Sequence, residues 1–189
     1  MNESKLKLIF SELIKQIDPN PERIGLKETP RRVVSAFKEL TEYNRSKETI
    51  NKYLVFFPTK GNDQLVTISN IFFASLCEHH LLPYYGYISI GYIPDNKILG
   101  LSKFKRIVDL ITKQLSVQED LCQQIYDFFI EKLQPKALVV YIEGKHTCAL
   151  IRGAKDEHST FSVINKSKYF SKNPVEINLF FKIIEKNKK

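Results

Sequence analysis

The sequence has few of the features that mark secreted or membrane proteins. Its 189 residues include 3 cysteines, too few and too widely spaced for a disulfide framework, so a reducing cytoplasm is the expected location. No apolar run approaches the roughly 18 residues of a membrane span. The first ten residues, MNESKLKLIF, lack the long apolar core of a secretion signal. We therefore expect no membrane partner.

Arginine is also scarce, although the chain as a whole is basic. The net charge is +8, and 6 of the 29 basic residues are arginines. The lysines are scattered, without aromatic residues interleaved at a regular spacing, so we interpret them as a solvated surface and expect no nucleic-acid partner. Because a guanidinium group matches the oxygens of a phosphate, the arginines next to the motifs below are candidates for anion contacts. These are Arg31, Arg32, Arg106 and Arg152.

The periodicity of the chain predicts an α+β protein, without internal repeats or a clear domain boundary. Apolar residues recur at helical spacing in five segments. These segments are residues 3–17, 28–43, 102–115, 117–133 and 173–189. In the second of them, Thr29 is the expected N-cap and Pro30 the first helical residue.

β-branched and aromatic runs predict two strand pairs between these helices. The first pair lies within residues 63–100, and the second lies within residues 136–153, with its turn at residues 143–146. Helices, a strand pair, two helices and a second strand pair follow one another. This order is typical of an antiparallel sheet that is covered by helices on one side.

Most of the few cysteines and histidines fall in two short clusters. Cys77, Glu78, His79 and His80 are consecutive, and the spacing of Cys77 and His80 lets both side chains converge on one ion from a tight turn. The second cluster, KHTCAL, contains His146 and Cys148 at alternate positions, which share a face in an ideal strand. If the two strand pairs share a sheet, Cys148 can approach the first cluster.

Cys77, Cys148 and one histidine of the first cluster would give a metal ion three protein ligands. Three ligands leave one coordination position open, as a catalytic zinc requires. His79 and His146 are then placed to move protons beside the metal, although the spacing alone leaves open whether His79 or His80 is the ligand. The alternative interpretation of the first cluster is a polar surface turn. Cys122, on a predicted helix, fits the role of a small buried apolar residue instead.

Several motifs together resemble one known family. The segments CEHHLLPYYG, GYIPDNKILGLSKFKRIVD, VQEDLCQQI and GKHTCALIRG, with NPERIGLKETPRRV upstream, are similar in order and spacing to GTP cyclohydrolase I. The similarity runs from about residue 19 to the C-terminus. It implies a zinc enzyme in which water attacks C8 of GTP and formate leaves, and the ribose then rearranges and recloses to give 7,8-dihydroneopterin triphosphate.

The resemblance also implies roles for individual residues. Zinc is bound by Cys77, His80 and Cys148. The acid–base residues are His79 and His146. Substrate contacts come from Ser102, Lys103, Arg106, Gln118, Glu119 and Arg152, and from Arg32 of a neighbouring subunit.

Two of these substrate residues have simpler alternatives. Glu119 matches the carboxylate that binds guanine in the family, but an acid in a first helical turn also stabilises the helix dipole. Ser102 matches a pocket residue of the family, but it also stands where a helix N-cap is expected.

By the same resemblance, the fold is a T-fold, a four-stranded antiparallel sheet with helices on one face. It occupies residues 46–189 as one catalytic structural unit, and residues 1–45 form an N-terminal helical region. The subunits are expected to form a homodecamer of two pentamers, with active sites between subunits and GTP as the substrate.

The chain departs from the family pattern in two places. Residues 154–170 include Phe161, Val163 and Ile164 where small hydroxyl residues are common, and Ser35 replaces a frequent lysine. We predict altered contacts along this segment and unchanged core chemistry. The alternatives are a catalytically altered T-fold relative that binds a guanine nucleotide or another purine or pterin, and a nitrile reductase of the same ancestry, which needs a cysteine nucleophile and no zinc.

Overall fold

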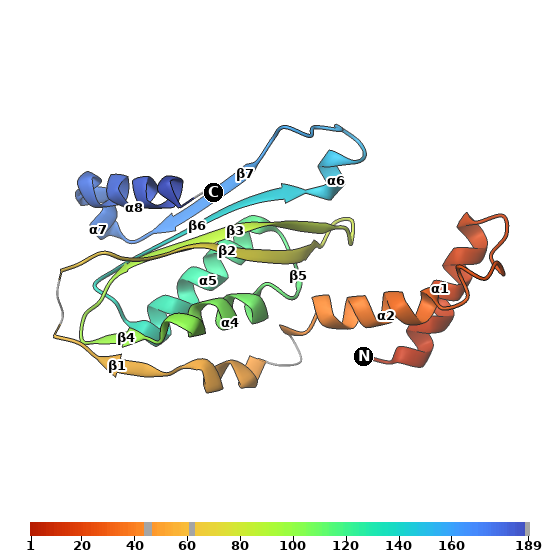
Figure 1. The fold of residues 1–189 in the computed structure, drawn as a ribbon, viewed down its shortest axis with the longest axis horizontal. Coiled ribbons are helices and arrows are strands. Elements are labelled where there is room, and N and C mark those ends of the chain that lie inside the picture. Colours follow the sequence, from red (N-terminus) through yellow and green to blue (C-terminus); the bar gives the residue numbers. More distant parts are fainter. Residues whose placement is uncertain (44–46, 61–62, 188–189) are drawn as a thin grey trace. The chain divides into compact units, whose positions relative to one another are not determined.

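The computed structural model describes residues 1–43, 47–60 and 63–187, which form two compact units, Met1–Glu42 and Tyr43–Lys189 (Figure 1). The predicted boundary between residues 45 and 46 lies outside the described residues. All five predicted helices form, and among the described residues none is long and apolar enough to cross a membrane.

The N-terminal unit is a pair of helices, α1 (Glu3–Ile17) and α2 (Thr29–Leu40). The rings of Phe10 and Phe37 join the two helices, with their centroids 5.5 Å apart. Lys38 Nζ lies 2.6 Å from a carboxylate oxygen of Glu3. An aromatic contact and an ion pair therefore hold α1 against α2.

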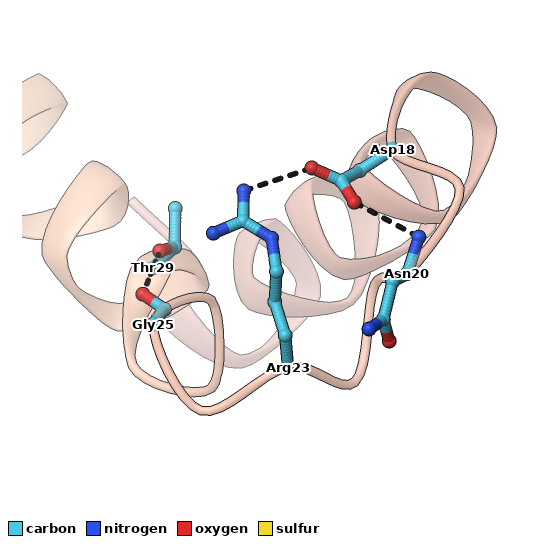
Figure 2. Close-up of polar contacts among 5 residues, drawn as sticks. All are labelled: Asp18, Asn20, Arg23, Gly25 and Thr29. Atoms are coloured by element: carbon cyan, nitrogen blue, oxygen red, sulfur yellow. Dashed lines mark hydrogen bonds and ion pairs between the residues drawn. The ribbon is translucent and has the colours of Figure 1, made fainter.

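The connection between α1 and α2 is organised by the carboxylate of Asp18 (Figure 2). One oxygen accepts a hydrogen bond from the backbone N–H of Asn20 and the other from the guanidinium of Arg23, each at 2.9 Å. The hydrogen bond from Arg23 is the largest cause that lowers the pKa of Asp18. Arg23 therefore serves the local structure of this turn.

Helix α2 begins one residue earlier than the sequence predicts. Thr29 is already helical, and Glu28 precedes it without a side-chain cap. The Thr29 hydroxyl instead donates to the carbonyl of Gly25 at 3.5 Å (Figure 2). The predicted N-cap role of Thr29 is therefore wrong, because its hydroxyl turns back to the preceding turn.

The second unit is built on a five-stranded sheet with the order β5-β2-β3-β6-β7. The long strands β2 (Val66–Cys77), β3 (Pro83–Ile93) and β6 (Ala137–His146) and the shorter β7 (Phe161–Lys166) pair antiparallel. They confirm the predicted α+β class and its four antiparallel strands. The sheet also gains a two-residue strand, β5 (Leu115–Ser116), which pairs parallel with the end of β2.

Helices α4 (Leu101–Ile111) and α5 (Gln118–Leu133) lie together on one face of this sheet (Figure 1). Apolar residues of α5 recur at helical spacing and are buried against the sheet. They are Leu121, Cys122, Ile125, Phe129 and Leu133. Burial raises the pKa of the Cys122 thiol to about 12. The prediction that Cys122 is a small apolar core residue is therefore confirmed.

The C-terminal helices α7 (Lys168–Lys172) and α8 (Pro174–Lys186) form a second, smaller cluster with the sheet. Phe180 of α8 packs beside Gly91, where a Cβ atom would lie 2.7 Å from its ring. Helix α8 thus covers part of the sheet that α4 and α5 leave open.

A separate two-stranded sheet pairs β1 (Phe56–Pro58) with β4 (Lys97–Leu99). Strand β1 follows the 3-10 helix η1 (Lys47–Tyr53).

Strand β6 does not turn back where the sequence predicts it. Residues 143–146 continue in register with β3, where Gly144 pairs with Gly86 and His146 pairs with Tyr84. The chain then enters the short helix α6 (Thr147–Leu150), so Cys148 is helical. The predictions of a turn at residues 143–146, and of His146 and Cys148 on one strand, are therefore wrong.

Candidate functional site

The first cluster lies in a tight turn at the end of β2. The backbone N–H of Cys77 donates to the carbonyl of Leu82 at 2.9 Å, and the N–H of Leu81 donates to the carbonyl of Cys77 at 2.8 Å. Leu81 has a positive φ of 55°. The turn keeps Cys77 buried and leaves His79 and His80 exposed.

Helix α6 brings the second cluster to the same end of the sheet. The Thr147 hydroxyl donates to the carbonyl of Pro83 at 2.6 Å, which fastens the start of α6 to β3. Cys148 follows directly. Burial is the largest cause that raises the pKa of its thiol, and the nearby Cys77 adds to this effect.

Cys77, His80 and Cys148 form a group that could hold a metal ion. Their donor atoms all lie within 4.8 Å of one another, and Cys77 Sγ is 3.7 Å from His80 Nδ1. Tetrahedral coordination by sulfur and nitrogen at zinc distances places donors about 3.4–3.8 Å apart. Two thiolates and an imidazole are also donors that zinc prefers, so the residues fit this metal.

His146 lies beside this group and is held on several sides. Its Nε2 lies 3.0 Å from Oε1 of Gln118. Its ring stacks on Tyr84 with centroids 4.6 Å apart and meets the edge of Phe161 at 5.2 Å. Burial lowers the pKa of His146, and the carboxylate of Glu119 partly offsets this. Both effects act on the charge of the ring, and its neutral form is the one that can accept a proton.

A buried network of hydroxyl groups lies under the stacked pair. The hydroxyl of Tyr84 is 2.7 Å from Ser116 Oγ, which is 3.2 Å from Ser75 Oγ. Ser75 in turn donates to the carbonyl of Gln114 at 2.9 Å. All three hydroxyl side chains are buried, and burial raises the pKa of Tyr84. The network fixes the ring on which His146 stacks.

These residues border a cavity of about 430 Å³. It lies between the ends of β2 and β6, the start of α5 and the start of β7. Seven of the predicted site residues line it: Cys77, His79, His80, Gln118, Glu119, His146 and Cys148. The cavity is within the usual size range of ligand sites.

Several other residues that shape this site were missed by reasoning from the sequence. Tyr84 and Ser116 belong to the hydroxyl network, and Val117 and Ala149 line the cavity. Tyr84, Ile88, Ile90 and Tyr92 stand at alternate positions of the β3 sequence, and this pattern is a signal that could have placed Tyr84 inside. Phe161, noted in the sequence as an unusual residue, also lines the cavity.

The remaining predicted substrate residues lie outside this cavity. Ser102 and Lys103 are in the first turn of α4, and Arg106 of the same helix lies over the ring of Tyr53 at 5.8 Å. Arg152 is exposed in the turn after α6, and Arg32 belongs to α2 of the N-terminal unit. Gly100 is the N-cap of α4, so the predicted N-cap role of Ser102 is wrong.

A larger hollow, of about 590 Å³, follows α5 but has the wrong charge for a nucleotide. Its lining includes Glu78, Asp120, Asp127 and Glu131. Four carboxylates repel a triphosphate, so the smaller cavity is the better candidate for an anionic substrate.

An antiparallel sheet backed by helices, with a potential metal-binding group and two further histidines in one cavity, defines an enzyme of the T-fold class. The family model for GTP cyclohydrolase I matches residues 6–185, and the chain belongs to this family, which is one of hydrolases. The resemblance seen in the sequence is confirmed.

Curated relatives agree with this assignment. The chain is 37% identical over 175 residues to the GTP cyclohydrolase 1 of Chlorobium chlorochromatii, covering 92% of this chain and 78% of the relative. It is 35% identical over 181 residues to that of Alkalilimnicola ehrlichii, covering 95% and 97%. It is also 40% identical over 169 residues to the bifunctional protein FolKE of Lactococcus lactis subsp. lactis, covering 88% of this chain and 47% of the relative. The chain thus spans about half the length of that bifunctional protein.

Proposed function

We propose that this chain is a zinc-dependent GTP cyclohydrolase I. Water attacks C8 of the guanine ring system, formate leaves, and the ribose rearranges and recloses to give 7,8-dihydroneopterin triphosphate. One observation carries this proposal: the donor atoms of Cys77, His80 and Cys148 lie within 4.8 Å of one another, in a cavity that His146 and Glu119 also line.

Cys77, His80 and Cys148 would hold the metal and leave one coordination position for other ligands. When bound, zinc supplies a Lewis acid that activates water near neutral pH. The thiolates require reducing conditions, which agrees with the cytoplasm as the location of the enzyme.

His146 and His79 move protons in this reaction. The half-buried imidazole of His146 accepts a proton in its neutral form, whereas His79 is exposed in the turn after β2 and acts from the solvent side. Glu119, at the start of α5, is an acceptor for the N1–H and amino groups of guanine. These groups supply proton transfer and base recognition within one chain.

The triphosphate needs cations that this cavity does not supply. None of the described residues that line it is a lysine or an arginine. We assign the phosphate contacts to Lys103, Arg106 and Arg152, and to Arg32 of a neighbouring subunit, and a further substrate contact to Ser102. This arrangement is consistent with active sites between subunits of a homodecamer made of two pentamers, in which residues 46–189 form the catalytic region.

A turnover assay tests this function directly. The zinc-loaded protein is incubated with GTP, and formate and dihydroneopterin triphosphate are measured together with bound zinc. Cys148→Ala should lose both zinc and turnover, while the control Cys122→Ala should keep both, because Cys122 is a core residue. Nucleotide binding without formate release in the zinc-loaded protein would overturn the proposal and favour a catalytically altered relative.

A further inference from the structure

The side-chain amide of Gln118 is engaged at both ends by the chain itself. Its Nε2 donates to the carbonyl of Phe161 at 3.0 Å and to the carbonyl of Ile142 at 3.3 Å. Its Oε1 lies 3.0 Å from Nε2 of His146. Gln118 is 2% exposed, so this amide lies almost entirely out of contact with solvent.

These partners fix which way round the amide lies. A backbone carbonyl can only accept a hydrogen bond, so the NH₂ group of Gln118 must face Phe161 and Ile142. The oxygen of the amide then faces His146, and that oxygen can only accept. Nε2 of His146 must therefore carry a proton.

The same contacts fix the tautomer of His146. A neutral imidazole carries a single N–H, so a proton on Nε2 leaves Nδ1 as the nitrogen with a free electron pair. The stacked ring of Tyr84 and the edge of Phe161 restrict rotation of the imidazole. If the proton were on Nδ1 instead, the unprotonated Nε2 would face Oε1 of Gln118, and this contact between two acceptors is unfavourable.

Strand β6 lies so close to the Gln118 amide that there is no room for a side chain at Gly144. A Cβ atom on Gly144 would lie 2.5 Å from Oε1 of Gln118. The next nearest atoms to that Cβ are Gln118 Cδ at 3.4 Å and a ring carbon of Phe73 at 3.6 Å. The absence of a side chain at residue 144 therefore allows the contact between Gln118 and His146.

We propose that Gln118 is a positioning residue, which holds His146 as the Nε2–H tautomer with Nδ1 as its proton-accepting atom. This inference rests on the proposed function and changes the role of substrate contact that the family resemblance implies for Gln118. Both N–H groups of Gln118 already have partners within the chain, so guanine recognition falls to Glu119 and not to Gln118.

The kinetic test replaces Gln118 by a residue of similar length without the amide. Gln118→Met should lower kcat for GTP by about 10- to 100-fold and leave KM about unchanged. Gln123→Met is the matched control, because Gln123 lies on the same helix and bonds to Asp127 and Asn165 instead. A rise in KM with kcat retained would overturn the inference, because it would mean that Gln118 binds substrate.

A double-mutant cycle separates positioning from a purely structural role. In a His146→Ala background, Gln118→Met should cause no further loss of turnover, because its partner is already absent. An equal loss in both backgrounds would show that Gln118 acts on something other than His146. Gly144→Ala displaces Oε1 without changing either side chain, and it should reproduce the fall in kcat.

The tautomer can be measured without any turnover. Solid-state nitrogen NMR of protein labelled with ¹⁵N-histidine, with His146→Ala used for assignment, distinguishes protonated from unprotonated ring nitrogens. The wild-type, zinc-loaded protein should show His146 protonated at Nε2, and Gln118→Met should show a mixture of tautomers. Protonation at Nδ1 in the wild type would overturn the inference. If this arm succeeds while GTP is not turned over, the proposed function fails and the positioning role stands.

Discussion

Replacing Tyr84 by phenylalanine tests whether the hydroxyl network beneath His146 is as the structure shows it. The change keeps the ring that stacks on His146 and removes the hydroxyl, which lies 2.7 Å from Ser116 Oγ. Ser116 keeps Ser75 as a partner at 3.2 Å, so no buried hydroxyl is left entirely without a hydrogen bond. The loss should therefore be about 1–2 kcal/mol of unfolding free energy.

Ser116→Ala should cost about the same, because it deprives the fully buried hydroxyl of Tyr84 of its 2.7 Å partner. The double variant removes both groups and leaves Ser75 bonded to the carbonyl of Gln114. Each single variant leaves one partner of the hydrogen bond unsatisfied, whereas the double variant leaves neither. The loss of unfolding free energy in the double variant should therefore be about 1 kcal/mol smaller than the sum of the two single losses.

Urea unfolding of the zinc-loaded protein measures this coupling. All variants are compared at one fixed protein concentration, so that any contribution of subunit association is the same for each. The urea concentration at the unfolding midpoint should fall in each variant, while the slope of unfolding free energy against urea concentration stays constant. If the loss of unfolding free energy in the double variant equals the sum of the two single losses within about 0.3 kcal/mol, the network is refuted, because independent sites are additive in this way.

Three further predictions follow from individual contacts. Cys148→Ala should lose bound zinc by elemental analysis while Cys122→Ala retains it, and equal retention in both would remove Cys148 from the metal site. Arg106→Gln should raise KM for GTP by about 10- to 100-fold through the loss of a charge-assisted contact, and initial rates with an unchanged KM would contradict this role. The pKa of Asp18 is lowered, so its contribution to stability is present above its ordinary value of 3.8 and is lost as the pH falls through the lower folded value. An NMR titration should show this pKa returning towards 3.8 in Arg23→Met, and no change would mean that Arg23 does not lower it.

The helices could be predicted from the sequence because their signals are local. The potential metal-binding group also needed the resemblance to the family, because the spacing left His79 and His80 as alternatives. Helical periodicity marks α5 over nearly its whole length, and the scarcity of cysteine and histidine makes Cys77, His80 and Cys148 conspicuous. Such signals need no knowledge of the tertiary structure. The strand character of β2, β3 and β6 was predicted by the same reasoning. The partner predicted for β6, residues 147–153, is not a strand, and the two-residue β5 is too short to leave a pattern.

The path of the chain around His146 could not be predicted in this way. Glu143, Gly144 and Lys145 resemble a turn in composition, but here the pairing with β3 determines their conformation. Gly86 shows why glycine is needed in this stretch, because a Cβ there would lie 2.0 Å from the carbonyl oxygen of Glu143. Glycine occurs in this region because two strands approach each other closely. From the local sequence alone, the same glycine is interpreted as a turn residue.

Gln118 illustrates the same limit for a functional residue. Its place beside Glu119 at the start of a helix suggests a second contact to the base, and the sequence contains no sign of the two carbonyls that occupy its amide. Those carbonyls belong to β6 and β7, residues 142 and 161, far from Gln118 along the chain. Because strand pairing alone brings them together, the unusual Phe161 can be accommodated: its backbone carbonyl, which any residue supplies, receives the hydrogen bond, and its ring adds an edge contact to His146. The departure from the family pattern at this position therefore leaves the support of His146 intact.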